Sequence, residues 1–279
     1  MSDSPSLASP SLHQWIAQQR LRGIQDGPLL TAMIDAGWDK GVARAALQTA
    51  PADAATAAVA LPALPGPDLS HEPGLIDVGD RQVRVLMHMQ RPRVVLFNAL
   101  LSDAECAQLI AAARPRLARS MTVQTASGAE EINADRTSDG MFFQRGETPL
   151  VQRLEERIAR LLNWPLENGE GLQVLRYGPG AEYKPHHDYF DPDEPGTASI
   201  VRRGGQRVGT LVIYLNEPLQ GGATVFPETA LQLVPQRGHA VFFSYDQPQP
   251  DTLTLHGGAP VIQGEKWIAT KWLRERRFD

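Results

Sequence analysis

The sequence predicts a mainly β domain with flanking helices, of the sandwich or jelly-roll type, preceded by a small N-terminal helical module. Three observations predict it. Short β-like runs separated by Gly, Pro and Asn fill the second half of the chain. Two helical segments precede most of these runs and do not alternate with them, which argues against a doubly wound sheet. An Ala- and Pro-rich stretch divides this part of the chain from the residues before it.

The composition excludes several classes of protein. The chain has 279 residues, 42% of them hydrophobic, and a net charge of −5, so a core is expected and a nucleic-acid partner is not. The single cysteine, Cys106, excludes an intramolecular disulfide framework. No apolar run reaches the roughly 18 residues of a membrane span, and the first residues lack the character of a secretory signal. These absences predict a cytoplasmic protein without a membrane partner.

Residues 1–50 are predicted to form a helical module. Apolar residues recur there at helical spacing, and Gly23 and Gly37 interrupt the pattern, which indicates three short helices. Asp39 is a candidate N-cap for the third helix. The stretch LLTAMIDAGWDKGVARAAL distantly resembles a ubiquitin-associated three-helix module, which implies protein docking. The alternative is a small bundle that packs on, or is tethered to, the main domain.

Residues 51–74 are rich in Ala and Pro and predict a semi-rigid linker, after which residues 75–279 form the main domain. The main domain begins with a strand in VVLFN, a helix capped by Ser102, and an amphipathic helix in PLVQRLEERIARLLNW. The strand-like runs that follow are LQVLRY, AEYKPHHDYF, VGTLVIYLN, ATVFPE, LQLVPQ, HAVFFSY, TLTLHGG, APVIQ and KWIATKWLRE.

Three side chains form a candidate metal site. If KPHHDYF is a strand, His186 and Asp188 project from the same face, while His187 points away. The best third ligand is His256, at the end of the later run TLTLHGG. Two histidines and one carboxylate on one side of an ion are typical of non-haem Fe(II) oxygenases, which keep positions open for a co-substrate and O₂.

A lysine ten residues after His256 strengthens this interpretation. The spacing allows a turn and a return strand, which would bring the ammonium of Lys266 beside the metal inside the barrel. A buried lysine needs a partner of opposite charge. A dianionic co-substrate with a distal carboxylate would supply that partner.

Residues 95–275 resemble the prolyl 4-hydroxylase branch of the 2-oxoglutarate/Fe(II) oxygenases. The segments that carry the resemblance are RTSDGMFF, ENGEGLQVLRYGPGAEYKPHHDYFDP, GGQRVGTLVIYLN, GGATVFPE and TLHGGAPVIQGEKWIATKWLRE, in this order. The resemblance implies a double-stranded β-helix (jelly roll), with Fe(II), 2-oxoglutarate and O₂ as cofactor and co-substrates. It also implies ascorbate as a candidate reductant.

The resemblance also implies roles for individual residues. Tyr177 and Lys266 would hold the distal carboxylate of 2-oxoglutarate, in a pocket lined by Thr210 and Trp272. The substrate would be faced by Tyr183 and Arg207, and its groove would be bordered by Glu170 and residues 136–138. An aromatic pocket that suits a pyrrolidine ring would be formed by Tyr183, Trp267 and Trp272.

The predicted function is hydroxylation of prolyl residues in a protein or peptide, with release of succinate and CO₂. Two alternatives stay open. One is the same chemistry on a free amino acid or small metabolite, for which no open peptide cleft is needed. The other is a non-catalytic jelly-roll binding protein, in which the N-terminal helices recruit a partner.

Overall fold

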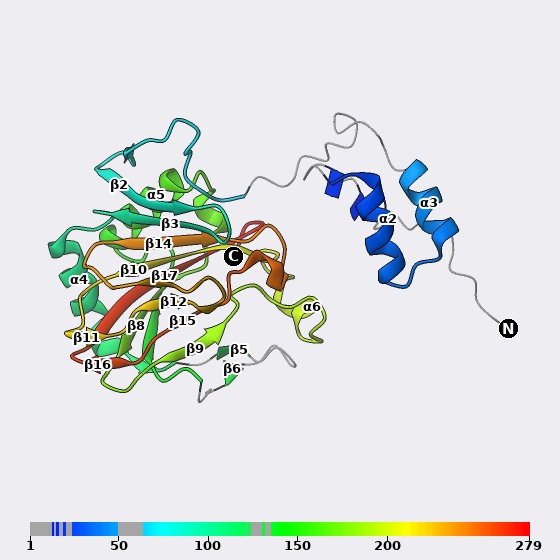
Figure 1. Ribbon diagram of the computed structural model, residues 1–279. Helices are drawn as coiled ribbons and strands as arrows, with labels where there is room; N and C mark the ends of the chain where they lie inside the picture. The colour runs from blue at the N-terminus through cyan, green and yellow to red at the C-terminus, as the bar shows by residue number, and fades with distance from the viewer. Residues whose placement is uncertain are drawn as a thin grey trace. The chain divides into compact units, whose positions relative to one another are not determined.

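The computed structural model divides the chain into two compact units, Met1–Ala63 and Leu64–Asp279 (Figure 1). No helix among the described residues is both long and apolar enough to cross a membrane. The described residues are 13, 15–16, 19–20, 24–49, 64–120, 122–123, 130–131 and 135–279.

The first unit contains helices α2 (Asp26–Asp35) and α3 (Lys40–Thr49). Asp39 caps α3 as predicted, because its Oδ1 accepts hydrogen bonds from the main-chain N–H groups of residues 41 and 42 at 2.8 and 3.1 Å. Of the first predicted helix, residues 13, 15–16 and 19–20 are helical, and the others lie outside the described residues. The core of this unit contains Ile16, Leu29, Met33, Ala43, Ala46 and Leu47.

The second half of the predicted linker belongs to the second unit. Pro65 and Gly66 are buried, and the N–H of Gly66 donates to the carbonyl of Leu162 at 2.7 Å. Leu64 and Leu69 pack against the core of the same unit. Residues 64–74 therefore lie against the domain, with a turn at residues 69–72, whereas residues 51–63 lie outside the described residues.

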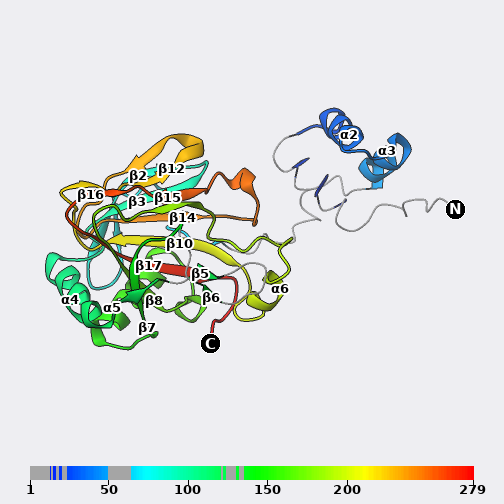
Figure 2. The same cartoon turned by 90° about the horizontal axis from the view of Figure 1, so that it is seen from below.

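Two sheets form the jelly roll of the second unit (Figures 1 and 2). The larger sheet has the order β1 (Leu75–Asp77), β2 (Gln82–Met89), β3 (Arg93–Asn98), β14 (Ala240–Ser244), β10 (Arg207–Tyr214), β17 (Lys266–Arg274), β8 (Leu172–Tyr177), β7 (Asp139–Phe143) and β4 (Ala118–Arg119). The smaller sheet has the order β13 (Leu231–Leu233), β12 (Thr224–Phe226), β15 (His256–Gly258) and β9 (Tyr183–His186). Two further pairs are β11 (Gln220–Gly221) with β16 (Val261–Gln263), and β5 (Thr122–Val123) with β6 (Glu130–Glu131).

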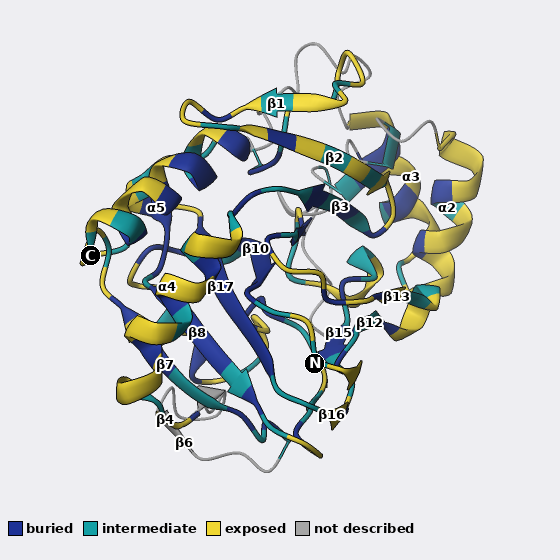
Figure 3. Ribbon diagram, turned by 90° about the vertical axis from the view of Figure 1, so that its left-hand side faces the viewer, coloured by how far each residue is buried: buried dark blue, intermediate teal, exposed yellow. Residues whose placement is uncertain are grey.

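Helices cover the face of the larger sheet that lies opposite the smaller sheet (Figure 2). The longer ones are α4 (Asp103–Ala113) and α5 (Pro149–Leu161), whose outer faces are exposed (Figure 3). The short helical elements are η1 (Arg114–Arg116), η2 (Leu166–Asn168), α6 (Thr197–Ile200), η3 (Pro227–Thr229) and η4 (Pro250–Thr252). Cys106 of α4 is buried, and burial raises the pKa of its thiol to about 11.

Alternation along β17 divides the interior into two cores. Trp267 and Leu273 belong to the helix-side core, together with residues of α4 and α5. Ile268, one residue after Trp267, belongs to the core shared with the smaller sheet. Successive side chains of a strand point to opposite faces, so Lys266 and Trp272 lie on the same side as Ile268, between the two sheets.

Two predicted strands are shorter than expected. The run AEYKPHHDYF is a strand only over β9, so Asp188 lies in the following loop and not on the strand. The run TLTLHGG is a strand only over β15, because Leu253 has a left-handed backbone with φ of 56°. The ligand side chains still converge, as described below.

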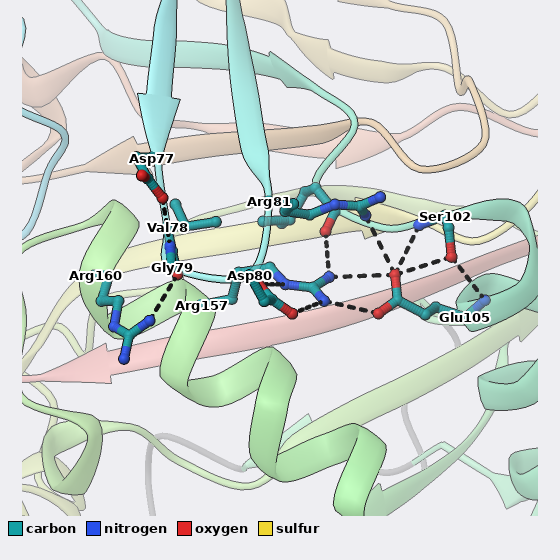
Figure 4. Close-up of polar contacts among 10 residues, drawn as sticks. Asp77, Val78, Gly79, Asp80, Arg81, Ser102, Glu105, Arg157 and Arg160 are labelled. Atoms are coloured by element: carbon teal, nitrogen blue, oxygen red, sulfur yellow. Dashed lines mark hydrogen bonds and ion pairs between the residues drawn. The ribbon is translucent and has the colours of Figure 1, made fainter.

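One arginine of α5 joins three separate segments through a network of ion pairs (Figure 4). Arg157 donates to the carboxylate of Asp80 at 2.6 and 2.9 Å, to Glu105 at 2.7 Å and to the carbonyl of Leu100 at 2.7 Å. Ser102 and Glu105 form a capping box at the start of α4, which confirms Ser102 as its cap. Burial would raise the pKa of Glu105, but Arg157 and Ser102 outweigh it and lower this pKa to about 2.

The variant Arg157→Met is expected to lower the free energy of unfolding by about 3 kcal/mol at pH 7, because it leaves two carboxylates without their shared cation. The pKa of Glu105 is lowered from 4.5 to about 2, so its contribution is present above pH 4.5 and is lost as the pH falls through about 2. The difference in the free energy of unfolding between the variant and the wild type should therefore shrink as the pH falls from 4.5 to about 2. Urea unfolding measures both effects.

Arg153→Met is the matched control, because Arg153 is an exposed arginine of the same helix. It should change the free energy of unfolding by no more than about 0.5 kcal/mol. A loss below about 1 kcal/mol in Arg157→Met would show that the network does not stabilise the fold.

Candidate active site

Two histidines and one aspartate meet between the two sheets. His186 ends β9 and His256 begins β15, and the two residues face each other in the antiparallel pairing of these strands. The Nε2 atoms of His186 and His256 each lie 3.5 Å from a different carboxylate oxygen of Asp188. The three ligand atoms lie within 4.8 Å of one another, and no other such group occurs in the described part of the chain. The arrangement predicted from the sequence is therefore present.

Main-chain carbonyls orient both imidazoles. Nδ1 of His186 lies 2.9 Å from the carbonyl of Lys184, and Nδ1 of His256 lies 3.0 Å from that of Thr254. A proton on Nδ1 that is donated to the carbonyl leaves the Nε2 lone pair directed at the shared point. Burial lowers the pKa of His256 to about 4 against the opposing effect of Asp188, so this imidazole is neutral near pH 7, as a metal ligand must be.

The carboxylate of Asp188 is held from the larger sheet. Thr210 of β10 donates its hydroxyl to Oδ2 of Asp188 at 2.8 Å, and the same hydroxyl lies 3.2 Å from that of Tyr245. Burial would raise the pKa of Asp188, but its interactions with His256 and His186 and the charge of Arg207 outweigh it. This pKa therefore lies far below its ordinary value, and the carboxylate is ionised.

A buried cation without a counter-ion occupies the same cavity as this triad. Lys266 is 3% exposed, and its Nζ lies 5.6 and 6.0 Å from the ring centroids of Tyr177 and Tyr214. No described carboxylate forms an ion pair with it, and burial lowers its pKa to about 7. A cavity with three metal-ligand atoms and a separate ammonium suits a small dicarboxylic acid, because a buried ammonium requires an anionic partner.

The other residues predicted for the co-substrate pocket differ in position. Tyr177 pairs in register with Lys266 and lines the cavity, and Trp272 lines it as well. Thr210 does not line it, because its hydroxyl is bound to the aspartate ligand, and Thr224 and Thr270 occupy the wall instead.

A second hollow also reaches the triad. Tyr183 lines it and stacks on His186, with ring centroids 3.6 Å apart. Arg207 lines it and donates to the main-chain carbonyl of Asp188 at 3.3 Å. Trp272 borders both the cavity and this hollow. The structure therefore brings Tyr183 and Arg207 to the metal ligands, as expected for residues that face a substrate.

Trp267 is not part of this aromatic wall, contrary to the prediction. It faces the helix-side core, where its Nε1 donates to Glu265 at 3.0 Å and the guanidinium of Arg114 lies 4.9 Å from its ring. The physical reason is the alternation of β17, which directs residues 267 and 272 to opposite faces.

Glu170 holds the guanidinium of Arg207, which lines the second hollow. Its two oxygens accept from Nε and Nη2 of Arg207 at 2.7 and 3.0 Å, and Nε of Arg274 lies 2.8 Å from Oε1. Burial would raise the pKa of Glu170, but Arg207 and Arg274 outweigh it and lower it. Glu170 itself does not line the hollow, although it was predicted to border the groove, whereas Arg136 lines both cavities.

Besides Thr224 and Thr270, the sequence analysis did not identify Phe190 and Arg274 beside the site. Phe190 lines the hollow, and Arg274 shares Glu170 with Arg207. The even spacing of eight residues between Lys266 and Arg274 within one strand could have placed Arg274 on the interior face. No comparable periodic signal exists for Phe190, which lies in a loop.

Comparison with known proteins gives the family. Residues 172–274 match the 2OG-Fe(II) oxygenase superfamily. Prolyl 4-hydroxylase 1 of Arabidopsis thaliana is 41% identical over 203 residues, which are 66% of this chain and 70% of that protein. Prolyl 4-hydroxylase 2 of the same plant is 37% identical over 212 residues, 68% of this chain and 69% of that protein. The chain belongs to the prolyl 4-hydroxylase family.

A solved structure of the family agrees with the fold. The crystal structure of viral collagen prolyl hydroxylase vCPH from Paramecium Bursaria Chlorella virus-1, in its 2OG complex, is 32% identical and has a TM-score of 0.50. The similarity covers 65% of this chain and 95% of that one. The predictions of a jelly roll and of a prolyl 4-hydroxylase-like dioxygenase are therefore confirmed.

The residues present fit Fe(II) and 2-oxoglutarate, the metal and co-substrate of this family. Two imidazoles and one carboxylate on one side of an ion are the donor set of non-haem Fe(II) oxygenases. The ammonium of Lys266, which has no counter-ion among the described residues, fits the distal carboxylate of 2-oxoglutarate.

The affinity for 2-oxoglutarate is expected to fall as the pH rises above about 7. Burial lowers the pKa of Lys266 to about 7 in the free enzyme, and the bound dianion favours the charged form. Above that pH the neutral amine must take up a proton on binding, so the Kd should rise about tenfold per pH unit. Calorimetry in buffers of different ionisation enthalpy measures this proton uptake. The variant Lys266→Arg should abolish the uptake, because its side chain is already charged. A Kd for 2-oxoglutarate that is constant from pH 7 to 9 would contradict the prediction.

Proposed function

We propose that the chain hydroxylates C4 of prolyl residues in a protein or peptide substrate. The reaction consumes O₂ and 2-oxoglutarate; one oxygen atom enters the C–H bond as hydroxyl and the other enters succinate, with release of CO₂. Fe(II) at the triad supplies the oxidation chemistry when bound. The single observation that carries the proposal is the position of the triad: one cavity holds it together with an ammonium that forms no ion pair with a described carboxylate, and a second hollow reaches His186 and Asp188 of the same triad.

The chain's own residues would bind and orient both molecules. Lys266 would neutralise the distal carboxylate of 2-oxoglutarate, and Tyr177 borders the same end of the cavity. Arg207 and Tyr183 would face the substrate beside the ligands, since both line the second hollow. The aromatic side chains of that hollow would cover the pyrrolidine ring and exclude water.

Succinate release with a panel of proline-containing peptides tests the proposal. With Fe(II) and 2-oxoglutarate present, one or more peptides should gain 16 Da by mass spectrometry, with fragment ions that place the oxygen on proline. His186→Ala should lose both the succinate and the modified peptide. His88→Ala is the matched control, because His88 is exposed on β2, and it should keep both.

The two alternatives are distinguished by the same assay. Succinate release with free proline or another small metabolite, and with no peptide in the panel, would support the small-molecule alternative. A complete lack of 2-oxoglutarate turnover with every candidate would support the binding-protein alternative. Neither is favoured, because the relatives that cover two thirds of the chain are prolyl 4-hydroxylases.

We propose ascorbate as the reductant that keeps the iron ferrous between productive cycles. Product formation without ascorbate should then stop after a few turnovers and resume when ascorbate is added. Linear kinetics over many turnovers without it would contradict this role.

We also propose that the first unit docks a protein partner in the cytoplasm. It has a hydrophobic core of its own, and α2 exposes part of Ile34. A chain without residues 1–63 should keep its kcat/KM for short peptides and lose kcat/KM only for a whole protein substrate. An equal loss for both would contradict docking.

A further inference from the structure

A column of alternating rings and guanidinium groups runs from Phe278 to Trp272, and we call these five residues the aromatic–arginine stack. Arg274 lies between two rings, with its guanidinium carbon 4.9 Å from the centroid of Phe278 and 5.0 Å from that of Phe190. Arg207 lies between the next two, 4.8 Å from Phe190 and 4.0 Å from Trp272. The stack therefore connects the segment after β17 with the wall of both cavities.

The charges of the stack explain why its rings are needed. Its two guanidinium groups share one ion-pair partner, Glu170, and the ionised carboxylate of Asp188 also acts on Arg207, so Arg274 has no ion-pair partner of its own among the described residues. Arg274 is buried, and each of the two guanidinium groups lies near two aromatic rings. The negative faces of the rings add to the stabilisation that the carboxylates give these cations. Removal of a ring should therefore displace the cations that rest on it.

The central ring is also held through its main chain. The side-chain amide of Gln206 accepts from the N–H of Phe190 at 2.8 Å and donates to its carbonyl at 2.7 Å. The main chain of Gln206 is bound in turn to Glu275: its N–H donates to the Glu275 carboxylate at 2.9 Å and its carbonyl accepts from the Glu275 N–H at 3.0 Å. The segment after β17 thus determines the position of Phe190 by two routes, one through rings and one through hydrogen bonds.

Three members of the stack line the hollow at the metal ligands, namely Phe190, Arg207 and Trp272. Phe278 and Gln206 do not line it. We propose that Phe278 and Gln206 are positioning residues for the prolyl substrate, which fix the Phe190–Arg207 wall of the hollow from outside it. This inference rests on the proposed function, because it assumes that the substrate occupies this hollow.

Steady-state kinetics of Phe278→Ala test the proposal. The KM for the best proline peptide should rise about tenfold, which corresponds to about 1.4 kcal/mol of lost binding. The KM for 2-oxoglutarate and the succinate released without peptide should stay within about twofold, because the co-substrate cavity is unchanged. Phe278→Tyr keeps the ring and should restore the peptide KM. Leu219→Ala, a truncation at a residue 77% exposed, is the control and should change neither KM.

Gln206→Ala is an independent second variant, and hydrogen exchange of the Phe190 amide is an independent second measurement. The amide should exchange at least about tenfold faster in both variants, because its acceptor is lost or displaced. An unchanged peptide KM in both folded variants, or an unchanged exchange rate, would overturn the proposal. If the wild type modifies no peptide while exchange in the variants quickens, the proposed function fails and the positioning of Phe190 stands.

Discussion

Asp188→Ala is expected to lose at least about a thousandfold in 2-oxoglutarate turnover and to lose tight Fe(II) binding. Asp188 is the carboxylate of the triad, and its two oxygens lie 3.5 Å from the two imidazole Nε2 atoms. Without it the two imidazoles remain, and two neutral ligands bind Fe(II) too weakly to hold it during turnover. Anaerobic Fe(II) titration and succinate release measure the two losses.

The control for this variant is Asp193→Ala, which removes an exposed aspartate of the same loop region. It should keep turnover within about twofold, since exposed sites rarely affect a distant centre. More than about a tenth of wild-type turnover in Asp188→Ala would show that Asp188 is not a required ligand. A second check is Thr210→Val, which removes the hydrogen bond to Oδ2 and should weaken Fe(II) binding by about 10- to 100-fold.

The second large effect is expected from Lys266→Met. The change keeps the length of the side chain and removes the ammonium, so the distal carboxylate of 2-oxoglutarate would be buried without a partner. Loss of one member of a buried charge pair costs about 2–5 kcal/mol, so the KM for 2-oxoglutarate should rise about 100-fold or more. The kcat at saturating 2-oxoglutarate should fall much less, because the triad is intact.

The same variant should be more stable than the wild type in the absence of 2-oxoglutarate. Lys266 is a buried cation without a counter-ion among the described residues, and methionine removes its desolvation cost. The midpoint of urea unfolding should therefore rise, and Lys40→Met, at an exposed lysine of α3, should change neither stability nor KM. A Lys266→Met enzyme with an unchanged KM for 2-oxoglutarate would contradict the role of this ammonium.

The family resemblance named Tyr177 and Trp272, and the spacing to His256 singled out Lys266; strand periodicity explains why these three side chains meet. Lys266 and Trp272 are six residues apart on β17, so both face the interior, and Tyr177 pairs with Lys266 on β8. The same alternation places Trp267 on the helix side. The prediction that Trp267 lines the aromatic pocket was therefore wrong, although the alternation of β17 predicts its true position. The capping box at Ser102 and the cap at Asp39 were predictable for a similar reason, since caps depend on local sequence.

What the sequence could not predict depends on loops and on partners distant in the chain. The strand that was predicted over residues 181–190 is limited to β9 and ends at His186, and Asp188 reaches the two histidines from a loop held by Thr210. Phe190 is positioned by Gln206, sixteen residues later, through an amide that no spacing rule selects. Such contacts depend on how a loop folds back, and one-dimensional patterns carry no information about that.

The position of the triad between the sheets has a consequence for the lifetime of the folded protein. His186 and His256 belong to the smaller sheet, whereas Asp188 is tied to the larger one through Thr210. A bound cation therefore cross-links the two layers, in a domain whose one cysteine is buried and unpaired. At 100 times its Kd such an ion adds about 2.7 kcal/mol to stability. Iron supply would then govern how long the enzyme survives unfolding and proteolysis as well as how fast it works.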